Sequence, residues 1–171
     1  KTGPVQGSLF GDFEEEASVE VFQTNLEKLS DVHHEYHLVD TEEEMSSLCE
    51  FLLTNSIVSL DTETTSTDAI VAKPVGLSFS VEGGKAWYVP VPNDELKSTR
   101  VFEIFRPFYE NREILKVGQN LKYDLTVLAS AGVRLAGPMF DTMVAHYLLQ
   151  PELRHNMDYL AEVYLKYQTI H

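Results

Sequence analysis

The sequence predicts an α/β domain with a mixed sheet flanked by helices. Three observations support this fold class. A capped helix lies between two apolar strand segments, two alternating segments flank the pair Gly83-Gly84, and strand and helix patterns then alternate along the rest of the chain. A meander of strands followed by alternating strands and helices is typical of layered α/β domains.

The first half of the domain contains one expected helix and four expected strands. Thr41 is followed three residues later by Glu44, and this capping box predicts that a helix begins there. Period-two alternation around the two glycines predicts a hairpin. The expected elements are a strand at 36–39, a helix from Thr41 to about residue 55, a strand at 57–61, and hairpin strands at 75–79 and 86–89.

The second half contains one short strand and four expected helices. Ser98 begins the first of these helices, which Pro107 interrupts or bends because proline lacks the backbone N–H. Gly132 ends the second helix, and Asp141 and Asp158 are interpreted as N-caps of the last two. The remaining expected elements are a strand at 114–117, a helix at 120–131, a helix after Asp141 and a helix from Met157 onward.

The acidic residues are concentrated outside this domain. Residues 1–50 hold 13 acidic and 2 basic side chains, a net charge of −11, whereas residues 51–171 hold 14 and 11, a net charge of −3. Residues 1–34 are predicted to be a flexible acidic arm, and residues 35–171 the folded domain. The chain has no basic stripe, so any nucleic-acid ligand must rely on metal ions, local cations or an attached domain.

Other features limit the environment of the protein. No apolar run approaches the roughly 20 residues needed to span a membrane, and no secretory signal precedes the first element. Cys49 shares a helical face with apolar residues and is expected in the core, which fits a reducing cytosol. The chain begins with Lys1, so it is expected to be a piece of a longer protein.

Asp61 and Glu63 are the strongest candidates for a functional site. They stand two residues apart at the end of an apolar strand, so both side chains are expected on one face. Like charges held together there repel unless a cation lies between them, and carboxylate oxygens are preferred ligands of Mg²⁺ and Mn²⁺. Taken alone, such a pair also fits a solvated strand end.

A third carboxylate, Asp124, follows on the helix after the next strand. Asn120 and Asp124 are four residues apart and share one helical face, which can lie beside the Asp61 strand. Three converging carboxylates require divalent cations, and two such ions can bind both the attacking and the leaving oxygen of a phosphodiester. The sequence therefore predicts a site for metal-dependent phosphodiester hydrolysis.

Five segments in order make this chain similar to a known family. They are residues 61–64 (Asp-Thr-Glu-Thr), 75–79 (Val-Gly-Leu-Ser-Phe), 117–124 (Val-Gly-Gln-Asn-Leu-Lys-Tyr-Asp), 140–143 (Phe-Asp-Thr-Met) and 157–162 (Met-Asp-Tyr-Leu-Ala-Glu). Together they closely resemble the 3′–5′ proofreading exonuclease domain of bacterial DNA polymerase I, a family A polymerase. The resemblance implies the ribonuclease-H-like exonuclease fold and a proofreading role in DNA replication and repair.

The resemblance also implies roles for individual residues. Asp61 and Glu63 would bind the first of two Mg²⁺ or Mn²⁺ ions. Asp61 would bridge to the second ion, and Asp124 would hold that ion largely through water. The residues implied to contact DNA are Thr64, Gln119, Asn120, Tyr123 and Arg154.

The chain departs from the family pattern in two places. Thr67 stands where the family usually has a leucine that wedges against the terminal base. The third motif of the family, a tyrosine followed four residues later by an aspartate, would lie beyond His171, because Tyr164 and Tyr167 have no such aspartate. The domain is therefore expected to be incomplete at its C-terminus, and the fragment to be weakly active or inactive.

Several alternatives and partners remain open from the sequence. The domain is expected to act on single-stranded 3′ ends of DNA, beside polymerase and 5′-nuclease domains of one cytoplasmic, nucleoid-associated parent. A ribonuclease-D-like RNA exonuclease and a non-catalytic spacer are alternatives. Gln6, Leu9 and Phe10 resemble the short peptide by which bacterial DNA enzymes bind the sliding clamp, although an ordinary linker has the same composition.

Overall fold

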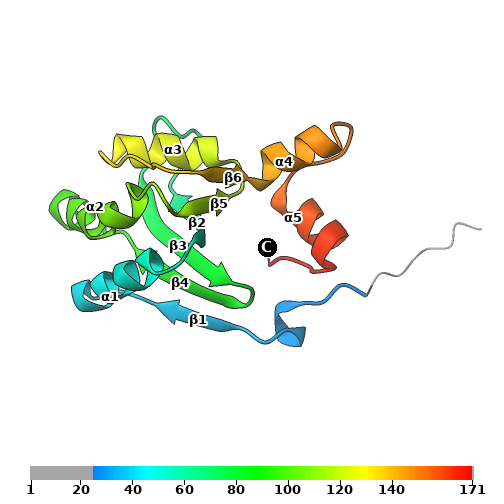
Figure 1. Ribbon diagram of the computed structural model, residues 1–171, viewed down its shortest axis with the longest axis horizontal. Helices are drawn as coiled ribbons and strands as arrows, with labels where there is room; N and C mark the ends of the chain where they lie inside the picture. Colours follow the sequence, from blue (N-terminus) through cyan, green and yellow to red (C-terminus); the bar gives the residue numbers. More distant parts are fainter. Residues whose placement is uncertain (1–24, 171) are drawn as a thin grey trace, which may run out of the picture.

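The computed structural model describes residues 25–170 of the chain, which form a six-stranded mixed sheet with helices packed on it (Figure 1). The strand order is β1-β4-β3-β2-β5-β6. β2, β3 and β4 form an antiparallel meander, whereas β1 pairs with β4, β5 with β2, and β6 with β5 in parallel. The predicted α/β fold with a mixed sheet is therefore confirmed.

The elements in chain order are η1 (Leu29–Asp31), β1 (Glu35–Leu38), α1 (Glu42–Leu53), β2 (Ile57–Thr64), β3 (Pro74–Glu82), β4 (Lys85–Pro90), α2 (Glu95–Tyr109), β5 (Leu115–Gly118), α3 (Leu121–Ser130), β6 (Met139–Asp141), α4 (Thr142–Leu149), α5 (Met157–Leu160) and η2 (Ala161–Leu165). Among these elements, no helix is long and apolar enough to cross a membrane. In Figure 1, α4 and α5 lie on the side of the molecule away from α1 and α2.

The core lies between the sheet and the helices α1, α2 and α3. Phe79 of β3 is 1% exposed and stacks on Phe105 of α2, with their ring centroids 5.1 Å apart. Cys49 is buried in the same core, as predicted. Burial of such apolar area is the main term that stabilises the sheet against its helices.

Local sequence signals place most of the elements correctly. Thr41 caps α1 and forms the predicted capping box with Glu44. Gly84 has a φ of +80° at the β3–β4 turn, which explains why this turn needs glycine. Glu44 also accepts from the backbone N–H of Asp40, so the carboxylate ties the strand end to the helix start.

Three details of the sequence interpretation are wrong. α2 begins at Glu95 instead of Ser98, because the side chain of Asp94 accepts from the backbone N–H of Lys97. Asp158 is not an N-cap. That position belongs to Asn156, and Asp158 accepts from the hydroxyl of Thr169 at 2.6 Å. The short strand β6 was not expected, since three residues carry too little periodicity to be recognised.

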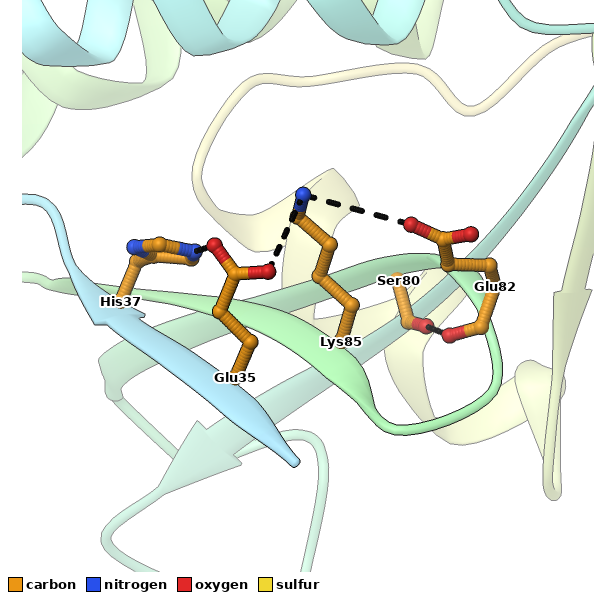
Figure 2. Close-up of polar contacts among 5 residues, drawn as sticks. All are labelled: Glu35, His37, Ser80, Glu82 and Lys85. Atoms are coloured by element: carbon orange, nitrogen blue, oxygen red, sulfur yellow. Dashed lines mark hydrogen bonds and ion pairs between the residues drawn. The ribbon is translucent and has the colours of Figure 1, made fainter. Parts of the chain in front are cut away.

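The outer edge of the sheet carries a polar contact group around Lys85 (Figure 2). The ammonium of Lys85 lies 3.3 Å from a carboxylate oxygen of Glu35 on β1 and 4.0 Å from one of Glu82 on β3. The Nε2 atom of His37 lies 2.8 Å from the other carboxylate oxygen of Glu35. These ion pairs are largely exposed and contribute little stability, but they favour the register in which β1 pairs with β4.

Two further polar contacts tie distant segments together. Glu27 exchanges backbone hydrogen bonds with Lys166 and Gln168, both at 2.8 Å, so residue 27 already contacts the end of the described chain. Lys116 on β5 is fully buried, and its ammonium donates to the backbone carbonyls of Asn111 and Ala136. Burial lowers the pKa of Lys116.

Candidate active site

Strand β2 places Asp61 and Glu63 on one face, as the sequence predicts. Leu60 and Thr62 are buried, with 3% and 6% exposure, whereas Asp61 is half-buried and Glu63 exposed. The pairs that β2 forms with β5 end at Ser59, while its pairs with β3 continue to Thr64. The two carboxylates therefore lie on a stretch of β2 that extends past the end of β5.

Asp124 on α3 reaches this same stretch of β2. Its side chain is 1% exposed, and its Oδ1 accepts from both the backbone N–H and the hydroxyl of Thr62, at 3.0 and 2.6 Å. Its Oδ2 is buried and has no hydrogen-bond partner in residues 25–170. Burial raises the pKa of Asp124, while the two bonds from Thr62 lower it.

The charges of two neighbouring carboxylates act on Asp61. The pKa of Asp61 is raised to about 6, first by burial, then by the charges of Asp124 and Glu63, while a hydrogen bond from the backbone of Thr62 opposes the rise. This repulsion on Asp61 is what a bound divalent cation would relieve, and the Asp124 oxygen that has no hydrogen-bond partner in residues 25–170 is free to act on one. By their chemistry, Asp61, Glu63 and Asp124 are the candidate ligands.

The expected convergence of three carboxylates on one point is not seen. Within the described part of the chain, no three His, Cys, Asp or Glu side chains are arranged to hold a metal ion. The reason lies in the local contacts, since Asp124 is turned to Thr62 and Glu63 lies on the exposed side of the strand. The carboxylates are coupled by charge without forming a closed cluster.

Four of the expected site residues surround a polar pocket of about 500 Å³, which we define by Glu63, Thr64, Asn120 and Tyr123. The hydroxyl of Tyr123 hydrogen-bonds with the hydroxyl of Thr64 and with the backbone carbonyl of Ser66. This contact joins α3 to the end of β2 across the pocket. Thr67, which stands at the position of the expected wedge residue, also lines it.

The turn before α3 depends on Asp141, whose carboxylate binds four backbone N–H groups. It accepts from Asn120 and Leu121 at 3.0 and 2.7 Å, and from Met143 and Val144 at 2.9 and 3.2 Å. Asn120 has a φ of 62°, a left-handed conformation that asparagine tolerates. Asp141 is thus the N-cap of α4, as predicted, and it also holds the start of α3.

A second cavity, which we call the apolar groove, lies beside Asp61. It measures about 540 Å³ and includes Asp61 and Gln119 together with apolar side chains of α4, α5 and η2, such as Leu149, Leu160 and Leu165. The amide of Gln119 is engaged within the protein. It donates to the backbone carbonyl of His155 at 2.6 Å and accepts from the hydroxyl of Thr142.

The remaining predicted residues either do not line the polar pocket or fall outside the described residues. Arg154 lies over the ring of Tyr159, 5.1 Å from its centroid. Gln6, Leu9 and Phe10 fall outside the described residues.

Sequence reasoning missed Thr62 and the pair His146–His155, whose Nδ1 atoms are 2.7 Å apart at the groove. Thr62 and Asp124 are 62 residues apart in the sequence, so no local sequence pattern could predict their contact.

Comparisons with known proteins identify the family of the chain and its fold. A family model described as 3′–5′ exonuclease, of the DNA polymerase A type, matches residues 36–171. DNA polymerase I of Pseudomonas aeruginosa is 42% identical over 123 residues, which are 67% of this chain and 14% of that protein. DNA polymerase I of Borreliella burgdorferi is 32% identical over 138 residues, 79% of this chain and 15% of that protein. The chain thus spans about one seventh of the length of these relatives.

Solved structures show the fold. The catalytic core of RRP6 from Trypanosoma brucei has a TM-score of 0.67 at 19% identity, covering 86% of this chain and 38% of that one. Escherichia coli RNase D, an exoribonuclease, has a TM-score of 0.64 at 18% identity, covering 80% and 35%. Brucella melitensis NrnC with bound Mg²⁺ has a TM-score of 0.64 at 20% identity, covering 81% and 65%. The fold is therefore that of the ribonuclease-H-like exonucleases.

Proposed function

We propose the function of this chain from its family, since it belongs to the 3′–5′ exonuclease family whose model matches residues 36–171. The proposed reaction is the metal-dependent hydrolysis of 3′-terminal phosphodiesters of DNA, which releases nucleoside monophosphates. The domain would serve as the proofreading unit of a DNA polymerase I. Its relatives of that name and greater length support this role.

One observation carries the proposal. Asp61 and Asp124, from different elements, are close enough that the charge of Asp124 raises the pKa of Asp61, and within residues 25–170 Asp124 keeps an enclosed oxygen without a hydrogen-bond partner. Such a pair lowers the stability of the fold, because a buried carboxylate oxygen without a hydrogen-bond partner costs free energy. Its presence therefore indicates a role other than packing. Charges arranged in this way are typical of catalytic sites.

Divalent ions bound there would neutralise the carboxylates and lower the pKa of a coordinated water to near neutrality. The protein's own groups would do the rest. Asp61, Glu63 and Asp124 would hold the ions, and the polar pocket lined by Glu63, Thr64, Asn120 and Tyr123 would receive the terminal nucleotide. Catalysis would then rest on positioning and on charge neutralisation, without a covalent intermediate.

A labelled single-stranded oligonucleotide incubated with the chain and Mn²⁺ tests the proposal. We expect slow release of mononucleotides from the 3′ end by the unaltered chain and none by Asp124→Ala. Excision by Asp124→Ala at the unaltered rate would remove that carboxylate from the mechanism. Calorimetric titration with Mn²⁺ separates the enzyme from a non-catalytic spacer, because a spacer would show no carboxylate-dependent binding.

RNA is the second candidate substrate, because the fold is similar to that of RNase D. The sequence relatives named above favour DNA, since both are DNA polymerases, at 42% and 32% identity. Matched DNA and RNA oligonucleotides of one sequence distinguish the two. Faster degradation of the DNA strand is the expected result, and a preference for RNA would replace the proofreading role with an RNA-processing one.

We further propose that full activity needs a third motif supplied by chain beyond residue 171. The apolar groove supports this, because it opens beside Asp61 and its rim residues Leu149 and Leu165 are 76% and 70% exposed. A helix carrying the missing tyrosine and aspartate would cover those side chains. A longer piece of the same parent should therefore cleave much faster than the 171-residue chain, and equal rates would show that the additional segment is dispensable.

A further inference from the structure

We propose that Thr62 is a positioning residue, which holds the carboxylate of Asp124 in one rotation so that its Oδ2 is the oxygen presented to the site. The inference rests on the proposed function, because it assigns a role to Thr62 through a carboxylate of that site. The Asp-x-Glu pattern draws attention to Asp61 and Glu63, but the residue between them makes the direct contact with α3.

The contact has two donors from a single residue. The backbone N–H and the hydroxyl of Thr62 both donate to Oδ1 of Asp124, at 3.0 and 2.6 Å. Thr62 lies three residues past Ser59, where the pairing of β2 with β5 ends. The helix α3 therefore contacts β2 where β5 has ended, and the carboxylate takes a backbone donor that the parallel pairing does not use.

Because both donors of Thr62 bind Oδ1 of Asp124, its Oδ2 is the oxygen that Thr62 leaves free. Oδ1 is occupied twice, whereas Oδ2 is enclosed and has no hydrogen-bond partner among the described residues. A carboxylate held at one oxygen cannot rotate without losing charge-assisted hydrogen bonds, which are among the stronger ones in proteins. Thr62 thus fixes the direction of Oδ2, and in the proposed mechanism this is the oxygen that remains to act on a cation or on the water of a cation.

The side chain at this position needs a hydroxyl. Thr62 is 6% exposed and Asp124 is 1% exposed, so water cannot replace a lost donor from the open solvent. Valine has the same shape as threonine but lacks the donor, and serine keeps the donor without the methyl group. The pair of substitutions therefore separates hydrogen bonding from packing.

The test measures Mn²⁺ binding by calorimetry and Mn²⁺-dependent excision for Thr62→Val and Thr62→Ser. We expect Thr62→Val to raise the Mn²⁺ concentration for half-saturation roughly tenfold, as loss of a hydrogen bond to a charged group implies. Thr62→Ser should stay within about twofold of the unaltered chain on the same principle. Thr126→Val is the matched control, because the hydroxyl of Thr126 donates only to the backbone of its own helix.

A double variant shows whether Thr62 acts through Asp124. If it does, Thr62→Val adds no further loss of binding to Asp124→Ala, because coupled residues are not additive. Equal losses in the presence and absence of Asp124 would overturn the inference, as would unaltered Mn²⁺ binding by Thr62→Val when Asp124→Ala has lost it. If Thr62→Val does not fold, Thr62→Ala carries the same expectations with a smaller side chain.

Failure of the proposed function gives a different pattern. An unaltered chain that neither binds Mn²⁺ nor excises nucleotides, or an Asp124→Ala variant that equals it in both, would remove the premise and the inference together. A chain that binds Mn²⁺ through Asp124 but ignores the hydroxyl of Thr62 would overturn the inference alone.

Discussion

The clearest quantitative prediction concerns Asp61 in the absence of metal. Asp61→Asn removes a charge that burial and two neighbouring carboxylates disfavour. The pKa of this group is raised from 3.8 to about 6. At about 1.4 kcal/mol per pKa unit, the ionised carboxylate destabilises the folded chain by at most about 3 kcal/mol, because solvent screening reduces the value. The variant should therefore unfold at a higher urea concentration than the unaltered chain.

The direction in which stability changes with pH follows from the number of protons that each state binds. The folded-state pKa lies above the unfolded one, so between pH 4 and 6 the folded state binds more protons, and the contribution of this group to stability falls as the pH rises through about 6. The advantage of Asp61→Asn should be largest at pH 7.5 and should shrink toward pH 4.5. Urea unfolding at these two values, in buffer containing a chelator, measures it.

Added metal should reverse the order of stability. In the proposed mechanism Mn²⁺ binds the folded state through the carboxylates and would stabilise it by mass action, and Asp61→Asn would lose this gain. The variant should then be the less stable protein in millimolar Mn²⁺. The reasoning would be refuted if Asp61→Asn were no more stable than the unaltered chain at pH 7.5 without metal, or if the difference between them did not change with pH.

Three further predictions concern Lys116, Asp141 and the pair Leu9 and Phe10. The pKa of Lys116 is lowered from 10.5, so just below that pH the unfolded state binds more protons than the folded state. The free energy of unfolding should therefore rise with pH in that range. Lys116→Met should lack this rise when urea unfolding is compared at pH 7.5 and 9.5. Asp141→Ala should cost about 2–4 kcal/mol in the same assay, and Asp141→Asn roughly half as much, because asparagine keeps one acceptor oxygen. Leu9→Ala/Phe10→Ala should abolish retention of the chain on the cognate sliding clamp in a pull-down; equal retention of both forms would show that the segment is an ordinary linker.

Much of the fold could be predicted because its signals are local. The capping box at Thr41 and the two glycines of the hairpin act within a few residues, and the structure confirms both. The start of α2 was placed too late because Asp94 and Ser98 are both acceptable caps, and only the actual contact with Lys97 distinguishes them. β6 depends on pairing with β5, which no short pattern reveals.

The candidate site could be predicted only as far as residue types and spacing reach. Alternation along β2 places Asp61 and Glu63 on one face, and the structure agrees. Which way Asp124 turns depends on a partner 62 residues away, so sequence spacing could not predict that it would bind Thr62. The double role of Asp141 has the same origin, since one of its two helices lies 20 residues before it.

The four backbone bonds of Asp141 have a mechanical consequence. One carboxylate anchors the helix that bears Asp124 and the helix that borders the groove, so the two cannot tilt independently. A shift of α4, for instance when a segment covers its exposed leucines, would move Asp141 and with it the start of α3, which carries Asp124. Docking at the groove and alignment of the carboxylates would thereby be linked, and the side chain of Asp141 would be one of the links.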